Sequence, residues 1–519
     1  MASRCPTCGA SANPRSEKLD LTIPAAGPQT IARYLQLMDT NEPPAAAELA
    51  YAQAVVSNTA ADLAGLDEEI ARLKTRLNQL EDEHSVLAIS RQRSLPIVSP
   101  LRRMPPEILS EIFLWTLPSP ADLAPGLPML KTRWLLSQVS RRWREVALST
   151  PSLWSLVSVS GRRKADPLPM IQAQVQRARS LKIHFYGSDT GDTTAQIRSF
   201  AFLSEHSLRW EELFVRLIPG MVPLMATLRG RLPSLRRLSI RWYNAKSQIG
   251  VETIRCFETA SSLEDVGFAS DFTYTPIPFP THRLTSYRVE GPLELHLGVL
   301  KMAPNIVEAR VMVAYDLHQP WPEPSDPAIG MLHLKRLCVT HVEVLDHLRA
   351  PSLAEIAINL SSTGQNPVDH LDPFFLRSSC TPRRFCVKDS PGLSITEKIL
   401  MKFTFITSFT VLSDSFEVLN AHLSMFAKTP IAFPHLNEIS FVSMDPSFFH
   451  YPLVLEMLQS RRSTQSALSS AAFVTSKGPG PDPITGLALN ALREAGMNIL
   501  ILENSDYWRR LNYESIWVF

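Results

Sequence analysis

The sequence predicts an α/β protein in which helices fill the first part and a repetitive, strand-containing region makes up the rest. Apolar residues recur at helical spacing up to about residue 154, and from about residue 165 a short leucine-based phrase recurs instead. The composition is that of a globular chain, since 45% of the 519 residues are hydrophobic and 20% are charged. A chain of this length is expected to contain about three folded units.

Charge and cysteine content exclude several classes of protein. A formal net charge of +2 does not fit a protein that seeks polyanions through its overall charge. Six cysteines are too few for a secreted scaffold built on disulfides. The sequence shows no apolar run long enough to span a membrane, and its first residues lack the apolar core of a secretory signal. We therefore expect a soluble protein of the cytoplasm, the nucleus or both, with no membrane partner.

Residues 1–60 are expected to be mostly flexible, because alanine, proline, serine and threonine dominate them. One short helix is predicted between Ile31 and Met38. Cys5 and Cys8 have the spacing of half a zinc site, but no second pair follows within reach. We therefore predict no metal and no other cofactor, although a dimer of the chain would bring two such pairs together.

Residues 61–92 show the heptad pattern of a coiled-coil helix. Steps of three and four residues place one set of side chains along a single seam: Leu63, Leu66, Ile70, Leu73, Leu77, Leu80, His84 and Leu87. Pro96 and Pro100 are expected to end this helix. The pattern fits a short coiled coil that forms a homodimer, and it fits equally well one amphipathic helix that packs on the next domain.

Residues 96–158 are predicted to form a small helical domain, because the charge balance changes from acidic to basic near residue 95. Its first helix begins at a pair of prolines, where the missing amide costs no hydrogen bond. Glu107 and Glu111 lie in its first turns, where carboxylates suit the positive end of the helix dipole. Four residues form one apolar face: Ile108, Leu109, Ile112 and Phe113.

A second helical stretch follows a proline-rich insert at 118–128. Its apolar stripe and the anchor that closes it are Leu135, Leu136, Val139, Trp143, Val146, Ala147, Leu153 and Trp154. Arg141, Arg142 and Arg144 lie beside the stripe. Burial of the two tryptophans would supply much of the core of so small a unit.

These residues together resemble the F-box, and specifically the F-box-like version common in large fungal families. The likeness lies in Met104-Pro105-x-Glu107-Ile108-Leu109-x-x-Ile112-Phe113, in Val139-Ser140-Arg141-x-Trp143 and in Leu153-Trp154. Met104 stands where a leucine is usual, and the proline-rich insert is longer than the usual loop. The resemblance implies a three-helix module that docks on the acidic Skp-type adaptor of a cullin-type ubiquitin ligase.

The adaptor contacts that the resemblance implies are Pro105, Glu107, Ile108, Leu109, Ile112, Phe113, Val139 and Trp143. An amphipathic helix can lay apolar residues in a partner's groove, and basic flanks favour an acidic partner. The same apolar residues would also suit the core of an ordinary helical hairpin. Val139 and Trp143 fit either the core or the interface.

Residues 165–519 repeat a phrase in which two leucines stand three residues apart and an apolar residue follows. Copies lie at 208–217, 232–240, 261–268, 282–289, 303–313, 332–339, 350–358, 381–387 and 433–442. The spacing of 19 to 28 residues resembles that of leucine-rich repeats, and it is measured between Leu235, Leu263, Leu284, Ile306, Leu334 and Leu353. Each phrase alternates like a short buried strand, so we expect the units to stack into a curved, irregular solenoid.

Side chains with chemical potential are scattered, and the sequence shows no phosphate-binding, dinucleotide-binding or hydrolase motif. Cys338 is expected to be a core cysteine and His341 and His347 surface residues, while Cys380 and Cys386 fit small buried positions. The basic clusters are expected to be solvated faces, which predicts no nucleic-acid partner: Arg141–Arg142, Arg162–Lys164 and Arg461–Arg462.

An F-box followed by leucine-rich repeats resembles the substrate receptor of a cullin-type (SCF) ubiquitin ligase. This implies that the F-box binds the adaptor, and through it a cullin, while the repeats hold an unidentified target protein. Other subunits would supply the chemistry, so we expect no catalytic residue in this chain. The alternative is a repeat scaffold that binds partners unrelated to degradation.

Overall fold

The computed structural model describes residues 27–117, 132–160 and 167–503, apart from 243–249, 252–253, 271–275, 315–320, 325–326, 360–365, 389–392, 414, 429–432, 444–448, 464–466 and 476–479. The chain divides into two compact units, Met1–Pro105 and Pro106–Phe519. We call them the N-terminal unit and the C-terminal unit. None of the helices in the described ranges is long and apolar enough to cross a membrane.

The described part of the N-terminal unit is helical, with α1 (Pro28–Asp39), α2 (Ala46–Val98) and α3 (Pro100–Arg103). α1 contains the short helix that the sequence predicts. It packs on the start of α2, where the rings of Tyr34 and Tyr51 meet edge to face at 5.5 Å. Arg33 of α1 forms ion pairs with Glu42 at 2.8 Å and with Glu48 at 3.4 Å.

α2 extends beyond the predicted coiled-coil segment at both ends. It begins at Ala46, so the expectation of flexibility is wrong for residues 46–60. Alanine has the highest helix propensity, and the Ala45 amide donates to the Glu48 carboxylate at 2.8 Å. Pro96 lies inside the helix and does not end it. In the last turn its missing amide removes a single backbone bond, and the helix ends two residues later.

The C-terminal unit opens with three short helices and a 3₁₀ turn. These are α4 (Pro106–Trp115), α5 (Thr132–Val139), α6 (Arg141–Leu148) and the turn Pro151–Trp154. The Ser140 hydroxyl caps α6, because it accepts a hydrogen bond from the Trp143 amide at 3.1 Å. The proline-rich insert at 118–128 lies outside the described residues.

Fourteen of the described strands form one parallel sheet in strict chain order. They are β1 (Leu156–Ser160), β2 (Leu181–Tyr186), β3 (Trp210–Arg216), β4 (Arg237–Trp242), β5 (Asp265–Ser270), β6 (Ser286–Gly291), β7 (Glu308–Val313), β9 (Arg336–Val339), β11 (Glu355–Asn359), β12 (Arg384–Lys388), β13 (Ser408–Ser413), β14 (Glu438–Ser443), β15 (Ser470–Thr475) and β16 (Asn498–Glu503). β8 (Ile329–Gly330) and β10 (Leu348–Arg349) pair separately. The protein is therefore a mixed α/β structure with one long parallel sheet.

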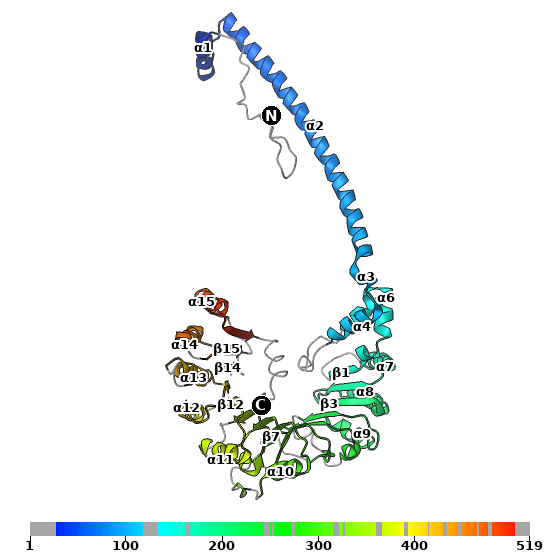
Figure 1. Ribbon diagram of the computed structural model, residues 1–519. Coiled ribbons are helices and arrows are strands. Elements are labelled where there is room, and N and C mark those ends of the chain that lie inside the picture. Colours follow the sequence, from blue (N-terminus) through cyan, green and yellow to red (C-terminus); the bar gives the residue numbers. More distant parts are fainter. Residues whose placement is uncertain are drawn as a thin grey trace. The chain divides into compact units, whose positions relative to one another are not determined.

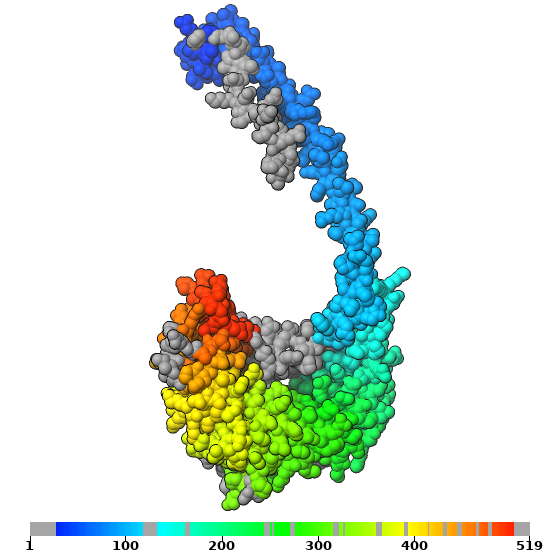
Figure 2. Space-filling view, viewed as in Figure 1, coloured from blue at the N-terminus to red at the C-terminus, as the bar shows by residue number. Residues whose placement is uncertain are grey.

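Helices connect most of these strands, and in the described residues two connections, β4 to β5 and β9 to β11, contain 3₁₀ turns without an α-helix. The α-helices are α7 (Leu168–Arg177), α8 (Thr194–Glu205), α9 (Val222–Ala226), α10 (Leu293–Met302), α11 (Val368–Ser378), α12 (Leu393–Lys402), α13 (Phe416–Lys428), α14 (Tyr451–Ser463) and α15 (Pro483–Glu494). Figure 1 shows the strands along the inner side of an arc and the helices along its outer side. In Figure 2 the colours follow one another along this unit, so segments that are neighbours in sequence are also neighbours in space.

Alternate residues of each strand point toward the helices and form the core. The predicted leucine-phrase positions Leu235, Leu263 and Leu284 are completely buried. One strand row joins Ile240, Phe268, Val289, Val311, Val339 and Ile358 in register, and all six are buried. The apolar row is therefore continuous from strand to strand, as parallel stacking requires.

The backbone repeats the same hydrogen-bond pattern at the start of successive strands. The carbonyl of Arg236 accepts from the amides of Glu264 and Asp265, and the carbonyl of Glu264 accepts from those of Thr285 and Ser286. The pattern continues through the described strands to the Asn437 carbonyl, which accepts from Ser469 and Ser470. Repeats of different length are therefore joined by the same local arrangement of backbone hydrogen bonds.

Candidate functional site

α4 has one buried side and one exposed side. Leu109 and Phe113 are completely buried, whereas Ile108 and Ile112 are 51% and 39% exposed. The four residues predicted to form one apolar face therefore fall into two pairs, one in the core and one in solvent. Leu109 and Phe113 were predicted to contact the adaptor, and the structure buries both of them where α4 packs on α6 and the 3₁₀ turn.

The buried side of α4 meets an aromatic residue of α6. The rings of Phe113 and Trp143 lie 5.0 Å apart at an angle of 53°. Trp143 is half-buried, while its neighbours Val146 and Ala147 are buried. Trp143 therefore contributes to the core and keeps part of its surface in solvent.

Trp154 joins the helices to the sheet. It is completely buried, and its Nε1 donates to the Ala147 carbonyl at 2.7 Å. The Trp134 ring lies edge-on at 5.0 Å, and the Arg177 guanidinium of α7 lies 4.5 Å from the Trp154 ring. Arg133 is also buried and donates to the Leu156 carbonyl at the start of β1. Burial lowers the pKa of Arg133 to about 10. These contacts hold the helices rigidly at the first strand.

The other predicted contact residues are exposed. Pro105 and Glu107 are exposed at the start of α4, and Val139 is 61% exposed at the end of α5. Leu135 lies one turn before Val139 and is 56% exposed. It was not among the predicted contacts, although its spacing of four residues from Val139 places both on one side of the helix. α4 and α5 therefore each present exposed apolar side chains, and we call Ile108, Ile112, Leu135 and Val139 together the candidate docking surface.

The charge around these helices is mixed. Arg141 and Arg144 are exposed on α6, and Glu107 and Glu111 are exposed on α4. The Arg144 Nε donates to the Ser137 carbonyl at 2.9 Å, which fixes the turn between α5 and α6. The basic side chains lie beside the exposed face of α5, where an acidic partner would approach.

The inner face of the sheet, defined as the side opposite the helices, carries arginines on β3, β4, β6 and β7. Arg216 of β3 is in register with Arg241 of β4, and Arg288 of β6 with Arg310 of β7. The Arg241 guanidinium lies 5.6 Å from the Phe214 ring. Burial lowers the pKa of Arg310, and the positive charges of Arg288 and Arg241 act in the same direction. The two pairs lie in different rows of the sheet, and like charges in adjacent cross-strand positions oppose folding, so each pair is costly for the sheet.

Acidic residues at the strand starts balance part of this charge. One arginine pairs across each of four strand boundaries: Arg237 with Glu212, Arg288 with Asp265, Arg336 with Glu308 and Arg384 with Glu355. Burial alone would raise the pKa of Glu212, but the hydrogen bond from His184 and the charge of Arg237 lower it overall. The His184 Nε2 lies 2.7 Å from the Glu212 carboxylate.

The inner face changes character toward the C-terminal strands. Cys338, Ala357 and Cys386 form a small buried cluster on β9, β11 and β12. On β13 and β14 the row of Cys386 continues with Thr410 and Ser440, and the adjacent row holds Leu412 and Val442. The inner face therefore carries arginines and an aromatic ring on the first strands, and buried small and aliphatic side chains beside polar ones on the later strands.

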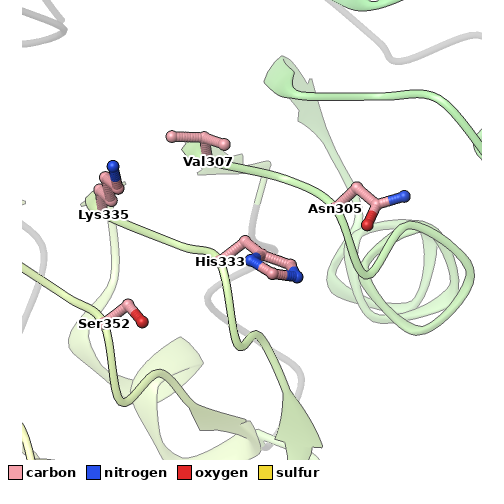
Figure 3. A pocket seen from close by; sticks show the side chains of 5 residues that line it. All are labelled: Asn305, Val307, His333, Lys335 and Ser352. Carbon is pink, nitrogen blue, oxygen red and sulfur yellow. The ribbon is translucent and has the colours of Figure 1, made fainter.

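A pocket of about 290 Å³ lies at the strand starts of β7, β9 and β11. Its lining comes from three successive loops and consists of Asn305, Val307, His333, Lys335 and Ser352. Figure 3 shows these side chains spread along the loops, with the His333 ring on the side toward Asn305. They do not gather around one point as the groups of a catalytic site would.

Two residues expected in solvent are buried. His347 is 2% exposed, because the 3₁₀ turn Val342–His347 packs its side chain inward. Arg461 is 1% exposed and donates to the carbonyls of Phe426 and Phe433. Burial lowers the pKa of Arg461 to about 10. Arg162–Lys164 lies outside the described residues.

The surroundings of the cysteines in the sheet fit a structural role. Cys380 and Cys386 are buried, as the sequence predicts, and Cys338 is completely buried. Burial raises the pKa of the Cys338 and Cys380 thiols to about 11, which keeps both protonated near neutral pH. Among the described residues, the side chains of histidine, cysteine, aspartate and glutamate form no group that could hold a metal ion. Cys5 and Cys8 lie outside those residues.

Neither a protein-family model nor a curated protein matches the chain.

Proposed function

We propose that this protein is the substrate-recognition subunit of a cullin-type (SCF) ubiquitin ligase. In this proposal the helices α4 to α6 act as an F-box-like module that binds a Skp-type adaptor, and through it a cullin. The observation that supports it most is the division of α4, where Leu109 and Phe113 hold the core while Ile108 and Ile112 remain in solvent. A helix fixed on one side and apolar on the other is suited to a partner's groove.

The exposed residues form the proposed adaptor-binding surface, with Ile108 and Ile112 on α4 and Leu135 and Val139 on α5. Truncation of a few central apolar anchors dominates the loss of affinity at most protein interfaces. Leu109, Phe113 and Trp143 act in this proposal as positioning residues, because their burial sets the orientation of α4. Glu107 and the arginines of α6 lie at the rim, where charge guides association more than it adds affinity.

The parallel sheet is the proposed target-binding part. Strands in strict chain order with helices on the outer side are the arrangement expected of a leucine-rich-repeat-type solenoid, and we propose that the inner face holds the target protein. Its two arginine pairs place positive charge on this face, where an acidic segment of a target would bind. The reaction itself would belong to other subunits of the ligase, so no residue of this chain is given a catalytic role.

Binding of the purified adaptor to the full-length chain tests the proposal, with titration calorimetry as the measurement. The double variant Ile108→Glu with Ile112→Glu should weaken binding by about 100-fold or more, since each position is an expected anchor. Both side chains are exposed, so the variant should remain folded by circular dichroism. Substitution of Leu109 or Phe113 would not separate binding from folding, because both are buried.

A matched control makes the same change elsewhere. Ile484 and Leu487 of α15 are 81% and 72% exposed, and Ile484→Glu with Leu487→Glu should bind the adaptor as the wild type does. Absence of binding by the wild type, or equal binding by both double variants, would overturn the proposal. The first outcome would favour a repeat scaffold that acts outside degradation.

A further inference from the structure

α2 presents an uncovered apolar seam to solvent. The residues Leu63, Leu66, Ile70, Leu73, Leu77, Leu80 and Leu87 are between 46% and 69% exposed, and α2 has no buried residue in the described structure. The seam runs over 25 residues, about 37 Å of helix at 1.5 Å per residue. A soluble helix with so regular an apolar seam gains its stability from a partner surface.

We propose that a second copy of this chain covers the seam, and that the two α2 helices form a parallel, in-register coiled coil. In heptad terms, Leu63, Ile70, Leu77 and His84 occupy the a positions. The d positions are all leucine, at 66, 73, 80 and 87. In a parallel pair each residue meets its own copy, so leucine packs on leucine at every d layer, which is the composition that two-stranded coils favour.

The charges beside the seam select this orientation. In a parallel pair, position g of one helix faces position e of the next heptad in the other. Glu69 then faces Lys74 of the second copy, and Arg76 faces Glu81, and symmetry doubles both pairs. Only Asp62 meets a like charge, at Asp67 near the start of the seam.

An antiparallel pair with the same seam in full overlap brings like charges together. Lys74 would then meet its own copy, Arg76 would meet its own copy, and Glu69 would meet Glu83. Within one helix Glu69 already pairs with Arg72 at 2.6 Å, but both side chains are largely exposed and such pairs contribute little. The charge pattern therefore disfavours the antiparallel arrangement.

His84 is the one polar residue in the seam, and it would meet His84 of the second copy. A polar residue at a single a position lowers stability and fixes register. A shift by one heptad would separate the two histidines and place one imidazole against Leu77 and the other against Arg91 at the next a position. A dimer would also carry two adaptor-binding surfaces and two inner faces, which raises the avidity for a target with two binding segments.

The mass of the full-length chain in solution tests this inference, measured by light scattering after size exclusion and without adaptor. The wild type should have twice the 58.0 kDa of one chain. The double variant Leu73→Asp with Leu77→Asp should have the mass of one chain. The control Thr75→Asp with Asn78→Asp adds the same charge to the same helical turns outside the seam, and should remain a dimer.

Orientation is tested by oxidation of Leu66→Cys in a background of Cys5→Ser and Cys8→Ser. A parallel pair brings the two introduced thiols together, and a covalent dimer should form. An antiparallel pair would separate them by about 27 Å, that is 18 residues of helix. A monomeric wild type, a seam variant that stays dimeric, or a dimer that does not crosslink at position 66 would each overturn the inference. Because the adaptor is absent, these results are independent of the proposed function.

Discussion

A buried histidine links β6 and β7 to the helix between them. His296 of α10 is completely buried. Its Nε2 lies 3.1 Å from the Gly291 carbonyl and 3.2 Å from the Met312 carbonyl, and its Nδ1 lies 2.8 Å from the Tyr287 hydroxyl. The carbonyls can only accept, so the ring proton belongs on Nε2 and the Tyr287 hydroxyl donates to Nδ1. Burial lowers the pKa of His296 from 6.5 to about 4.

This histidine makes stability depend on pH in a defined window. Above pH 6.5 it is neutral in both the folded and the unfolded chain. Between pH 6.5 and about 4 only the unfolded chain binds the proton, so the free energy of unfolding falls as the pH falls. The loss should reach about 3 kcal/mol, at 1.36 kcal/mol for each pKa unit.

Urea unfolding of the wild type and of His296→Gln at pH 7 and pH 4.5 isolates this contribution. Glutamine keeps a donor and an acceptor but does not titrate. The wild type should lose about 2–3 kcal/mol more than the variant on acidification. An equal loss in both proteins would show that His296 is not the group responsible.

At the scale of elements, the repeated phrase predicts only some of the strands of the sheet. β13 and β15 were missed, although both follow the same spacing. Before β13 the anchor is Ile406, and Phe409 is the first strand residue that points toward the helices. Before β15 the anchor is Leu468, and the corresponding strand residue is Ala471. The core requires an apolar side chain that fills the space, and leucine is one solution among several.

β1 and β2 were also missed, and before β2 the anchor position is taken by Ala178. α2 shows the converse error, because an alanine-rich composition was interpreted as flexibility. The contact that stabilises the start of α2 is local. The Glu48 carboxylate accepts a hydrogen bond from the Ala45 amide, one of the backbone amides at a helix start that have no partner within the helix. Element boundaries depend on such single contacts more than on the average composition of a segment.

Arg461 shows how the helix of one repeat is attached to the preceding repeat. Its guanidinium lies 5.3 Å from the Phe426 ring and 5.5 Å from the Phe433 ring. Its Nε donates to the Phe426 carbonyl at 3.3 Å, and its Nη1 to the Phe433 carbonyl at 3.4 Å. The charge is costly to bury, but its removal would leave these carbonyls without their donors.

Arg461→Met should therefore lower the free energy of unfolding by about 1–3 kcal/mol, although methionine fills a similar volume. The neighbouring residue Arg462 is exposed, and Arg462→Met should change it by less than about 0.5 kcal/mol. Both variants can be compared by urea unfolding followed by circular dichroism. If both substitutions lower the free energy of unfolding by the same amount, Arg461 does not hold α14 to the preceding repeat.

At the scale of the whole molecule, the repeated phrase is sufficient to predict a long sheet whose strands follow chain order. It does not reveal the inner face, since the variable positions of the phrase give no sign of which arginines will lie side by side on adjacent strands. The sequence likewise does not reveal which residues of the candidate docking surface are exposed. The four apolar residues of α4 are recognisable from their spacing, but only the position of α6 decides that Leu109 and Phe113 are buried and that Ile108 and Ile112 are not.

Hydrogen exchange of the full-length chain, with and without the adaptor, tests the central claim most directly because it reports both binding and its location. We expect the adaptor to slow amide exchange in peptides that cover Pro106–Trp115 and Thr132–Val139, and to leave those of β14 and α15 unchanged. The variant Ile108→Glu with Ile112→Glu should show no such protection. Unchanged exchange throughout the wild type, or protection confined to the sheet, would contradict adaptor docking by α4 and α5.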